Sequence, residues 1–211
     1  MARRIGLFGG SFNPIHCGHL IVARAVAETL RLESVLLLPS ARPPHKPGLS
    51  ADDAAHAAEM VKLAIAHERL FEFSGFDLTR PGPTYTIDTV DHFAREFGPD
   101  AELFWIIGAD SLRDLPTWHR VSELADACTI VTAARAGTPA PDLSALRGIL
   151  NPEQLEKLRG GVLSTPRIDI SSSDIRRRAQ QGLSTRYLVP DAVGTYIESN
   201  RLYLDPSGGA S

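Results

Sequence analysis

The strongest constraint on how this chain folds lies in its first twenty residues. The stretch from Gly6 to Leu20 reads GLFGGSFNPIHCGHL. Its apolar start at residues 5–8 predicts a buried strand, and Gly9 and Gly10 predict a tight turn that allows close backbone approach to a ligand. A helical spacing of apolar residues then continues to Val26. A strand, a glycine turn and a helix therefore follow one another within thirty residues.

Two histidines mark the start of that helix. Because His16 and His19 are three residues apart, they can share one helix face, and helix N-termini favour anions. A lone histidine at such a place is usually a surface residue or a local cap. The hypothesis of a phosphate site therefore depends on the combination of strand, glycine turn, paired histidines and helix start. The pattern is neither a Walker A loop, which needs Gly-Lys-Ser/Thr, nor a dinucleotide fingerprint, whose glycine spacing differs.

The rest of the chain alternates strands and helices. A continuous apolar run predicts a buried strand at residues 34–38. Further strands are predicted at 70–76, 103–107 and 129–133. Periodic segments predict helices at about 17–30, 51–67, 84–97, 111–115 and 121–125, from Asn151-Pro152 onward, and at 171–181 and 191–199. This order predicts an α/β fold with a doubly wound parallel sheet and a small C-terminal helical portion over about 171–204. We expect one domain over residues 1–204 and a disordered tail at 205–211.

Length, charge and cysteine content limit the kinds of function that this chain can have. The 211 residues suit one domain with a substantial core. A net charge of −3 gives no overall basic field for nucleic acid. The two cysteines, Cys17 and Cys128, form no disulfide framework and suit a reducing compartment; we interpret Cys17 as a small filler rather than a nucleophile. No secretory h-region and no apolar run of about 18 residues is evident, so we expect a cytoplasmic protein without membrane spans.

Three further loops carry candidate ligand-binding residues. After the second predicted strand, Lys46 on a proline-stiffened loop can reach a phosphate, or it is simply solvated. The helix start at 84–86 offers free N–H groups to an anion, or it is an ordinary capped start. Asp110 follows a strand and suits sugar hydroxyls or a helix cap, whereas Trp118 suits ring stacking or core packing.

A strand end enters another helix at residues 168–176. Ser171 and Asp174 have capping-box spacing. Three arginines nevertheless occupy the first turns, where cations oppose the macrodipole, a small cost that makes sense if an anion binds there. Of these, Arg176 is the one placed to reach back toward a polyphosphate.

Together these segments resemble a known family. GGSFNPIHCGHL contains the H-x-G-H signature of the nucleotidyltransferase superfamily. With PPHK, RPGPTYTIDT, IGADSL, PRIDISSSDIR and YLVP followed by YI, the chain resembles the bacterial nicotinate-nucleotide adenylyltransferases from about Arg4 to Tyr203. Ser11 and Asn13 replace the family's frequent Thr and Asp, and Cys17 a frequent aromatic residue. Residues 134–148 carry no resemblance.

The resemblance implies a Rossmann-like nucleotidyltransferase that joins ATP to nicotinate mononucleotide in NAD biosynthesis, releasing pyrophosphate. It implies in-line attack at the α-phosphate without a covalent intermediate, with Mg²⁺ carried by the ATP phosphates rather than by protein side chains. The implied catalytic residues are His16, His19, Lys46 and Arg176. The implied ATP-binding residues are Gly9, Gly10, Ser11, Phe12, His16, His19, Ser172, Ile175 and Arg176. Nicotinate mononucleotide would contact His45, Lys46, Thr84, Tyr85, Thr86, Asp110 and Trp118.

Two alternatives stay open at this point. The chain could be another adenylyltransferase, such as one for pantetheine phosphate, although residues 82–89 and Trp118 argue against this. It could also be a non-catalytic nucleotide sensor on the same fold, although the intact set of His16, His19, Lys46 and Arg176 argues for catalysis. The expected partners are small-molecule substrates, with no nucleic acid and no membrane; a homo-oligomer is left open.

Overall fold

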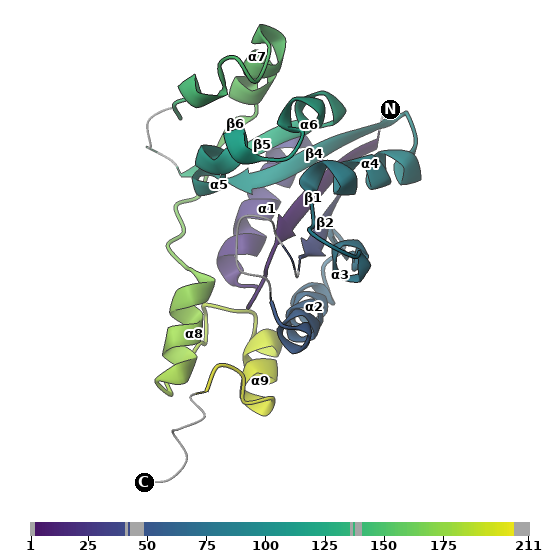
Figure 1. Ribbon diagram of the computed structural model, residues 1–211. Coiled ribbons are helices and arrows are strands. Elements are labelled where there is room, and N and C mark those ends of the chain that lie inside the picture. The colour runs from purple at the N-terminus through teal and green to yellow at the C-terminus, as the bar shows by residue number, and fades with distance from the viewer. Residues whose placement is uncertain (1–2, 41, 43–48, 136, 138–140, 205–211) are drawn as a thin grey trace.

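A six-stranded parallel sheet forms the centre of the molecule (Figure 1). The computed structural model describes residues 3–40, 42, 49–135, 137 and 141–204. The strand order is β3-β2-β1-β4-β5-β6, and every neighbouring pair is parallel. The strands are β1 (Arg3–Gly10), β2 (Ser34–Pro39), β3 (Phe71–Phe73), β4 (Ala101–Gly108), β5 (Thr129–Arg135) and β6 (Val162–Thr165).

Helices cover both faces of this sheet. One apolar cluster joins the sheet to α4, α5, α6 and α7, and a second joins it to α1, α2, α8 and α9. This arrangement confirms the predicted doubly wound α/β fold. The helices are α1 (Cys17–Leu30), α2 (Ala51–Ile65), α3 (Phe76–Thr79), α4 (Thr86–Phe97), α5 (Ala109–Asp114), α6 (Val121–Ala127), α7 (Pro152–Gly160), α8 (Ser172–Gln180) and α9 (Asp191–Ser199), with 3₁₀ turns η1 (Leu115–Thr117) and η2 (Ser144–Leu146).

Beyond their first residues, the central strands are apolar because both of their faces are covered. Successive side chains of a strand point to opposite faces. Leu103, Trp105 and Ile107 of β4 accordingly belong to one cluster, whereas Phe104 and Ile106 belong to the other. No helix in the described ranges has both the length and the apolar character needed to cross a bilayer.

Several predicted boundaries were wrong. The strand predicted at 70–76 is confined to β3, because the Phe76 N–H turns to the Ser74 hydroxyl at 3.3 Å and begins α3. The strand β6 was missed altogether, since it is four residues long and lies at the sheet edge. Helix α2 ends at Ile65 instead of residue 67, and α5 begins at Ala109 instead of 111. The predicted tail at 205–211 lies outside the described residues.

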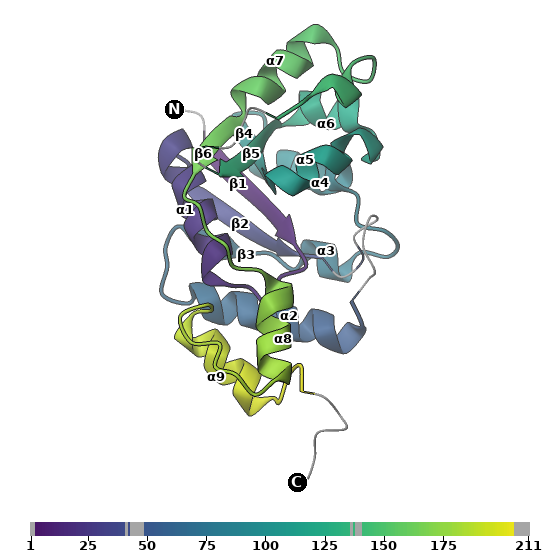
Figure 2. The same cartoon turned by 90° about the vertical axis from the view of Figure 1, so that its left-hand side faces the viewer.

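The strand order indicates where a ligand crevice is expected. From β1 the chain builds outward to β3, and it then returns to the other side of β1 to build β4, β5 and β6. In open α/β sheets, ligands bind beyond the carboxyl ends of the strands at such a reversal. In both views α8 and α9 lie together at one end of the molecule, away from α6 and α7 (Figures 1 and 2).

Candidate active site

Gly9 and Gly10, the last two residues of β1, lie close to aromatic rings where the strand leads into the loop before α1. A Cβ on Gly9 would come within 2.8 Å of the Trp105 ring, and one on Gly10 within 3.1 Å of the Phe12 ring. Phe12 has a positive φ of 43° and is buried. The loop backbone therefore packs directly on aromatic rings at the carboxyl end of β1.

The two predicted histidines lie against each other at the start of α1. His16 is the N-cap, and its Nδ1 accepts from the His19 N–H at 3.3 Å. His19 Nδ1 accepts in turn from the His16 N–H at 3.3 Å, which makes a reciprocal capping box from two imidazoles. The ring centroids are 3.6 Å apart with planes inclined by 20°.

These hydrogen bonds assign the tautomers. Because Nδ1 accepts a hydrogen bond in both rings, each neutral ring carries its proton on Nε2. Burial lowers the pKa of His16 to about 4, so His16 is neutral near pH 7. The pair thus presents Nε2–H groups, which are suited to donate to anionic oxygens.

Gly18, between the two histidines, also has a steric role. A Cβ at this position would lie 3.0 Å from His16 Nδ1 and 3.1 Å from the Ile168 side chain. A side chain here would push against the His16 ring and against the segment that leads into α8. The glycine of the H-x-G-H pattern therefore allows close packing of the His16 ring and of the segment that leads into α8.

Helix α8 brings further predicted residues to the same loop. Ser172 Oγ donates to the Pro14 carbonyl at 2.8 Å, and Arg176 Nη1 donates to the Asn13 carbonyl at 2.6 Å. Ile175 is fully buried in the second apolar cluster and fixes α8 in place.

The arginine next to Arg176 has a different environment. Arg177 pairs with Asp174 on the exposed side of α8, whereas the Arg176 guanidinium lies on the β1–α1 loop. Ser171 caps α8 by accepting from the Asp174 N–H at 3.1 Å, as its spacing predicted. Arg176, rather than Arg177, is therefore the arginine that contacts the loop of the candidate site.

Two residues of this site were not identified as functional from the sequence. The Asn13 side chain is buried and its Oδ1 accepts a hydrogen bond from the Tyr203 hydroxyl. The sequence marked Asn13 only as a departure from the family pattern. Tyr203 is 190 residues away from Asn13 in the sequence, and no pattern in the sequence indicates that it contacts this loop.

The predicted acceptor-binding residues lie on other elements. Thr84 is buried, and its N–H donates to the Arg42 carbonyl at 3.0 Å. Tyr85 is the N-cap of α4, and its ring centroid lies 4.3 Å from that of His119. Trp118 is half-buried against the first apolar cluster, and Asp110 is exposed in the first turn of α5. His45 and Lys46 lie outside the described residues.

The start of α4 is flanked by charges. Its N-cap, Tyr85, makes no side-chain capping hydrogen bond within the described part of the chain. Asp88 in the first turn of α4 lies 3.2 Å from Arg80 and 3.8 Å from Arg120. These ion pairs tie the segment before α4 to the start of α6.

A buried carboxyl lies beneath this segment. Asp77 is 4% exposed and accepts from the Thr89 hydroxyl at 2.7 Å. Burial raises its pKa to about 6, although Thr89 and Arg80 partly oppose this shift. Asp77 also lines a cavity of about 480 Å³ between α2 and α3, together with Arg42 and Arg80. The histidines do not line this cavity, so hydrogen bonding rather than cavity size locates the site.

Asp77→Asn is expected to stabilise the protein at neutral pH. A carboxyl with a raised folded-state pKa favours folding when protonated, and this stability is lost as pH rises from about 4 through about 6. Asparagine keeps the acceptor for Thr89 and carries no charge, so the gain should grow over that window to on the order of 2 to 3 kcal/mol. Chemical denaturation at pH 4 to 7.5 measures it, with exposed Asp100→Asn as control. Parallel pH curves for Asp77→Asn and wild type would refute the assignment.

The described residues contain no cluster of three or more His, Cys, Asp or Glu side chains arranged to hold a metal. The histidine pair offers N–H donors, and the Asn13 side-chain oxygen already accepts from Tyr203. This donor set suits phosphate oxygens better than a cation. The site geometry is therefore compatible with a metal ion that arrives bound to a polyphosphate.

The chain is similar to known proteins along nearly its whole length. Residues 7–178 match the cytidylyltransferase-like family model. A probable nicotinate-nucleotide adenylyltransferase of Synechococcus sp. (strain JA-3-3Ab) is 44% identical over 206 residues, covering 97% of this chain and 96% of the relative. A protein of the same name from Thermus thermophilus is 44% identical over 200 residues, covering 95% and 99% of the two chains.

Solved structures share the fold. The nicotinic acid mononucleotide adenylyltransferase of Plasmodium falciparum, complexed with NaAD, superposes with a TM-score of 0.70 at 18% identity and covers 95% of this chain and 97% of its own. A Vibrio parahaemolyticus structure described as a nicotinate-nucleotide adenylyltransferase gives a TM-score of 0.66 at 17% identity, with 95% of both chains covered.

Proposed function

The chain belongs to the nicotinate-nucleotide adenylyltransferase family, within the cytidylyltransferase-like proteins, and from this premise we infer that it transfers the adenylyl group of ATP to nicotinate mononucleotide. The products are nicotinate adenine dinucleotide and pyrophosphate, so the reaction is a step of NAD biosynthesis. The observation that carries this inference is 44% identity over nearly the full length of relatives with that name. The stacked histidines at the start of α1 explain how such a chain can bind a polyphosphate.

The chemistry needs no protein nucleophile. A phosphate oxygen of the mononucleotide attacks the α-phosphate of ATP in line, and the bond from the α-phosphorus to the bridging oxygen breaks to release pyrophosphate. Catalysis then consists of positioning and charge stabilisation. Burial raises the pKa of the Cys17 thiol, which keeps it protonated and supports its interpretation as a filler.

We assign the ATP phosphates to the β1–α1 loop and α8. The Nε2–H groups of His16 and His19 would donate to phosphate oxygens, and the Arg176 guanidinium would stabilise charge on the transition state and the leaving pyrophosphate. Lys46 would add a second cation. The ATP pocket would be shaped by Gly9, Gly10, Ser11, Phe12, Ser172 and Ile175. Two of these residues, Ser172 and Ile175, hold α8 against the loop.

We propose that Mg²⁺ enters with ATP. When bound to the phosphates, the ion would neutralise part of their charge. The protein side chains orient the triphosphate and donate hydrogen bonds to it. We further propose that the reaction takes place in the cytoplasm with small-molecule substrates alone.

The acceptor would bind at the start of α4. Free N–H groups of the first turn favour the ring carboxylate, and Trp118 would pack on the pyridine ring. Thr84, Tyr85 and Thr86 would frame the carboxylate. Asp110 would bind sugar hydroxyls, and His45 and Lys46 would reach the acceptor phosphate.

Pyrophosphate release tests this function. Purified protein with Mg-ATP is offered nicotinate mononucleotide, nicotinamide mononucleotide, phosphopantetheine or no acceptor. We expect rapid release with nicotinate mononucleotide and formation of the dinucleotide. Preferential release with phosphopantetheine would identify a different adenylyltransferase, and binding of ATP without release for any acceptor would identify a nucleotide sensor.

Arg176→Lys is expected to lower kcat by at least about tenfold, because an ammonium cannot reproduce the planar fork that holds phosphate oxygens. The matched control is Arg177→Lys on the same helix, whose side chain pairs only with exposed Asp174 in the described contacts. This control should retain wild-type kcat. Normal kcat in Arg176→Lys together with a loss in Arg177→Lys would show that the wrong arginine had been assigned.

A further inference from the structure

The Asn13 residue of the β1–α1 loop is held at both of its oxygens by the C-terminal part of the chain. Its carbonyl accepts from Arg176 Nη1 at 2.6 Å, and its side-chain Oδ1 accepts from the Tyr203 hydroxyl. We propose that Tyr203 is a positioning residue for adenylyl transfer, which acts through Asn13 to fix the histidine pair and Arg176 relative to each other. This inference rests on the proposed function, because it concerns the same ATP site.

The Tyr203 hydroxyl is placed as a permanent donor. The side chain packs against the second apolar cluster, and burial raises the pKa of its hydroxyl far above the physiological range. Among the described residues, the hydroxyl also lies 4.0 Å from the Met60 sulfur, a weak acceptor. The Asn13 amide oxygen is therefore the acceptor that satisfies the hydroxyl.

Asn13 transmits this contact to the catalytic groups. It is three residues from His16, and the intervening Pro14 carbonyl accepts from Ser172 on α8 at 2.8 Å. All four residues between Phe12 and Cys17 are buried, as is Phe12 itself. The loop therefore cannot relax freely into solvent. A shift of Asn13 would move the Arg176 guanidinium and the N-cap of α1 together. Displacements of about 1 Å can reduce catalysis a hundredfold.

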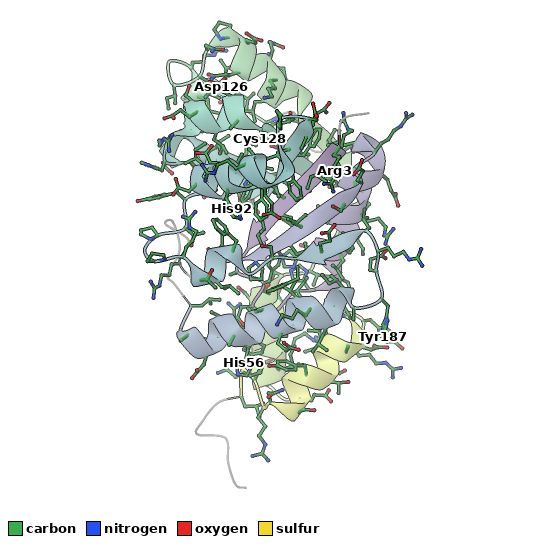
Figure 3. The ribbon with its side chains drawn as sticks, turned by 90° about the vertical axis from the view of Figure 1, so that its right-hand side faces the viewer. Arg3, His56, His92, Asp126, Cys128 and Tyr187 are labelled. Carbon is green, nitrogen blue, oxygen red and sulfur yellow. The ribbon has the colours of Figure 1, made fainter. Side chains whose placement is uncertain are left out.

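A second tyrosine in the same region provides the matched control. The Tyr196 hydroxyl on α9 lies 2.9 Å from His56 Nδ1 on α2, and Figure 3 shows His56 on α2 next to α9. This contact joins α9 to α2 without touching the β1–α1 loop. Both tyrosines thus link the C-terminal segment to the body of the protein through one hydroxyl, but only Tyr203 reaches the candidate site.

The test compares Tyr203→Phe with Tyr196→Phe. We expect Tyr203→Phe to lower kcat about tenfold and to weaken binding of a non-hydrolysable ATP analogue severalfold, while KM for nicotinate mononucleotide stays within about twofold of wild type. Tyr196→Phe should stay within about twofold in all three quantities. Thermal melting of both variants checks that their stabilities are comparable. Equal kinetic losses in the two variants would reduce Tyr203 to a structural role and overturn the proposal.

A double-mutant cycle tests the route through Asn13. In an Asn13→Ala background, Tyr203→Phe should produce no further loss of ATP-analogue affinity, because the acceptor is already gone. A full additional loss in that background would show that Tyr203 acts by another route. Calorimetric binding of the ATP analogue does not depend on the acceptor, so the cycle remains decisive even if the assigned acceptor is wrong.

Discussion

His19→Ala is expected to lower kcat for adenylyl transfer by roughly a hundredfold or more, the range for loss of a preorganised donor at a developing charge. The ring would offer its Nε2–H to a phosphate oxygen, because its Nδ1 already accepts from the His16 N–H. The fold should survive, since His19 is only half-buried. Steady-state kinetics and a thermal melt measure the two effects separately. Near-normal kcat in the folded variant would contradict the assignment.

The histidine capping box requires a control for structure. Removing His19 also removes the hydrogen bond to the His16 N–H, at a cost of about 1 kcal/mol for a cap. Glutamine is a preferred residue at this third helical position and can accept from the same N–H. His19→Gln should therefore retain more stability than His19→Ala and lose as much activity. Recovery of kcat in His19→Gln would mean that the cap, rather than the imidazole, supports turnover.

The second large effect concerns the choice of acceptor. We expect kcat/KM for nicotinate mononucleotide to exceed that for its amide analogue by at least about a hundredfold, as in sites that penalise an unpaired polar group. The first turn of α4 offers N–H donors that no described side chain caps, and these favour a carboxylate over an amide NH₂. Arg80 lies in the same segment, where its side chain is 15% exposed and its charge is paired with that of Asp88.

Measurement of kcat/KM for both mononucleotides at saturating Mg-ATP decides this prediction. Trp118→Phe serves as the control, because an aromatic ring that packs on the pyridine does not distinguish acid from amide. The variant should lower both values and leave their ratio unchanged. Equal kcat/KM values for the two acceptors in wild type would mean that the start of α4 does not distinguish the carboxylate from the amide.

Features that are local in sequence were predictable. The strand and the helix of the first thirty residues lie where expected, because each depends on neighbouring side chains and on hydrogen bonds within a few residues. The turn predicted at Gly9 and Gly10 was wrong, since both glycines are the last residues of β1. The Asn151 cap with Pro152 is likewise present, with Gln154 completing it. Strand β6 escaped prediction because only one of its four residues is buried and its pairing comes entirely from β5.

Long-range features were not predictable in the same way. The Asp88 carboxylate between Arg80 and Arg120 follows from how two loops meet, as does the burial of Asp77. The lowered pKa of His16 depends on packing by distant segments. The assigned roles of Lys46 and of the other site residues remain predictions that the proposed experiments test.

The contact between Asn13 and Tyr203 also has a consequence for the order of synthesis. Ribosomes make the chain from the N-terminus and domains begin to fold in that order. The β1–α1 loop therefore leaves the ribosome long before the tyrosine that anchors it, 190 residues later. A nascent chain can assemble β1, α1 and their neighbouring strands, but its loop stays without this anchor until residue 203 has emerged. Completion of the site thus waits until the last described turn has left the ribosome.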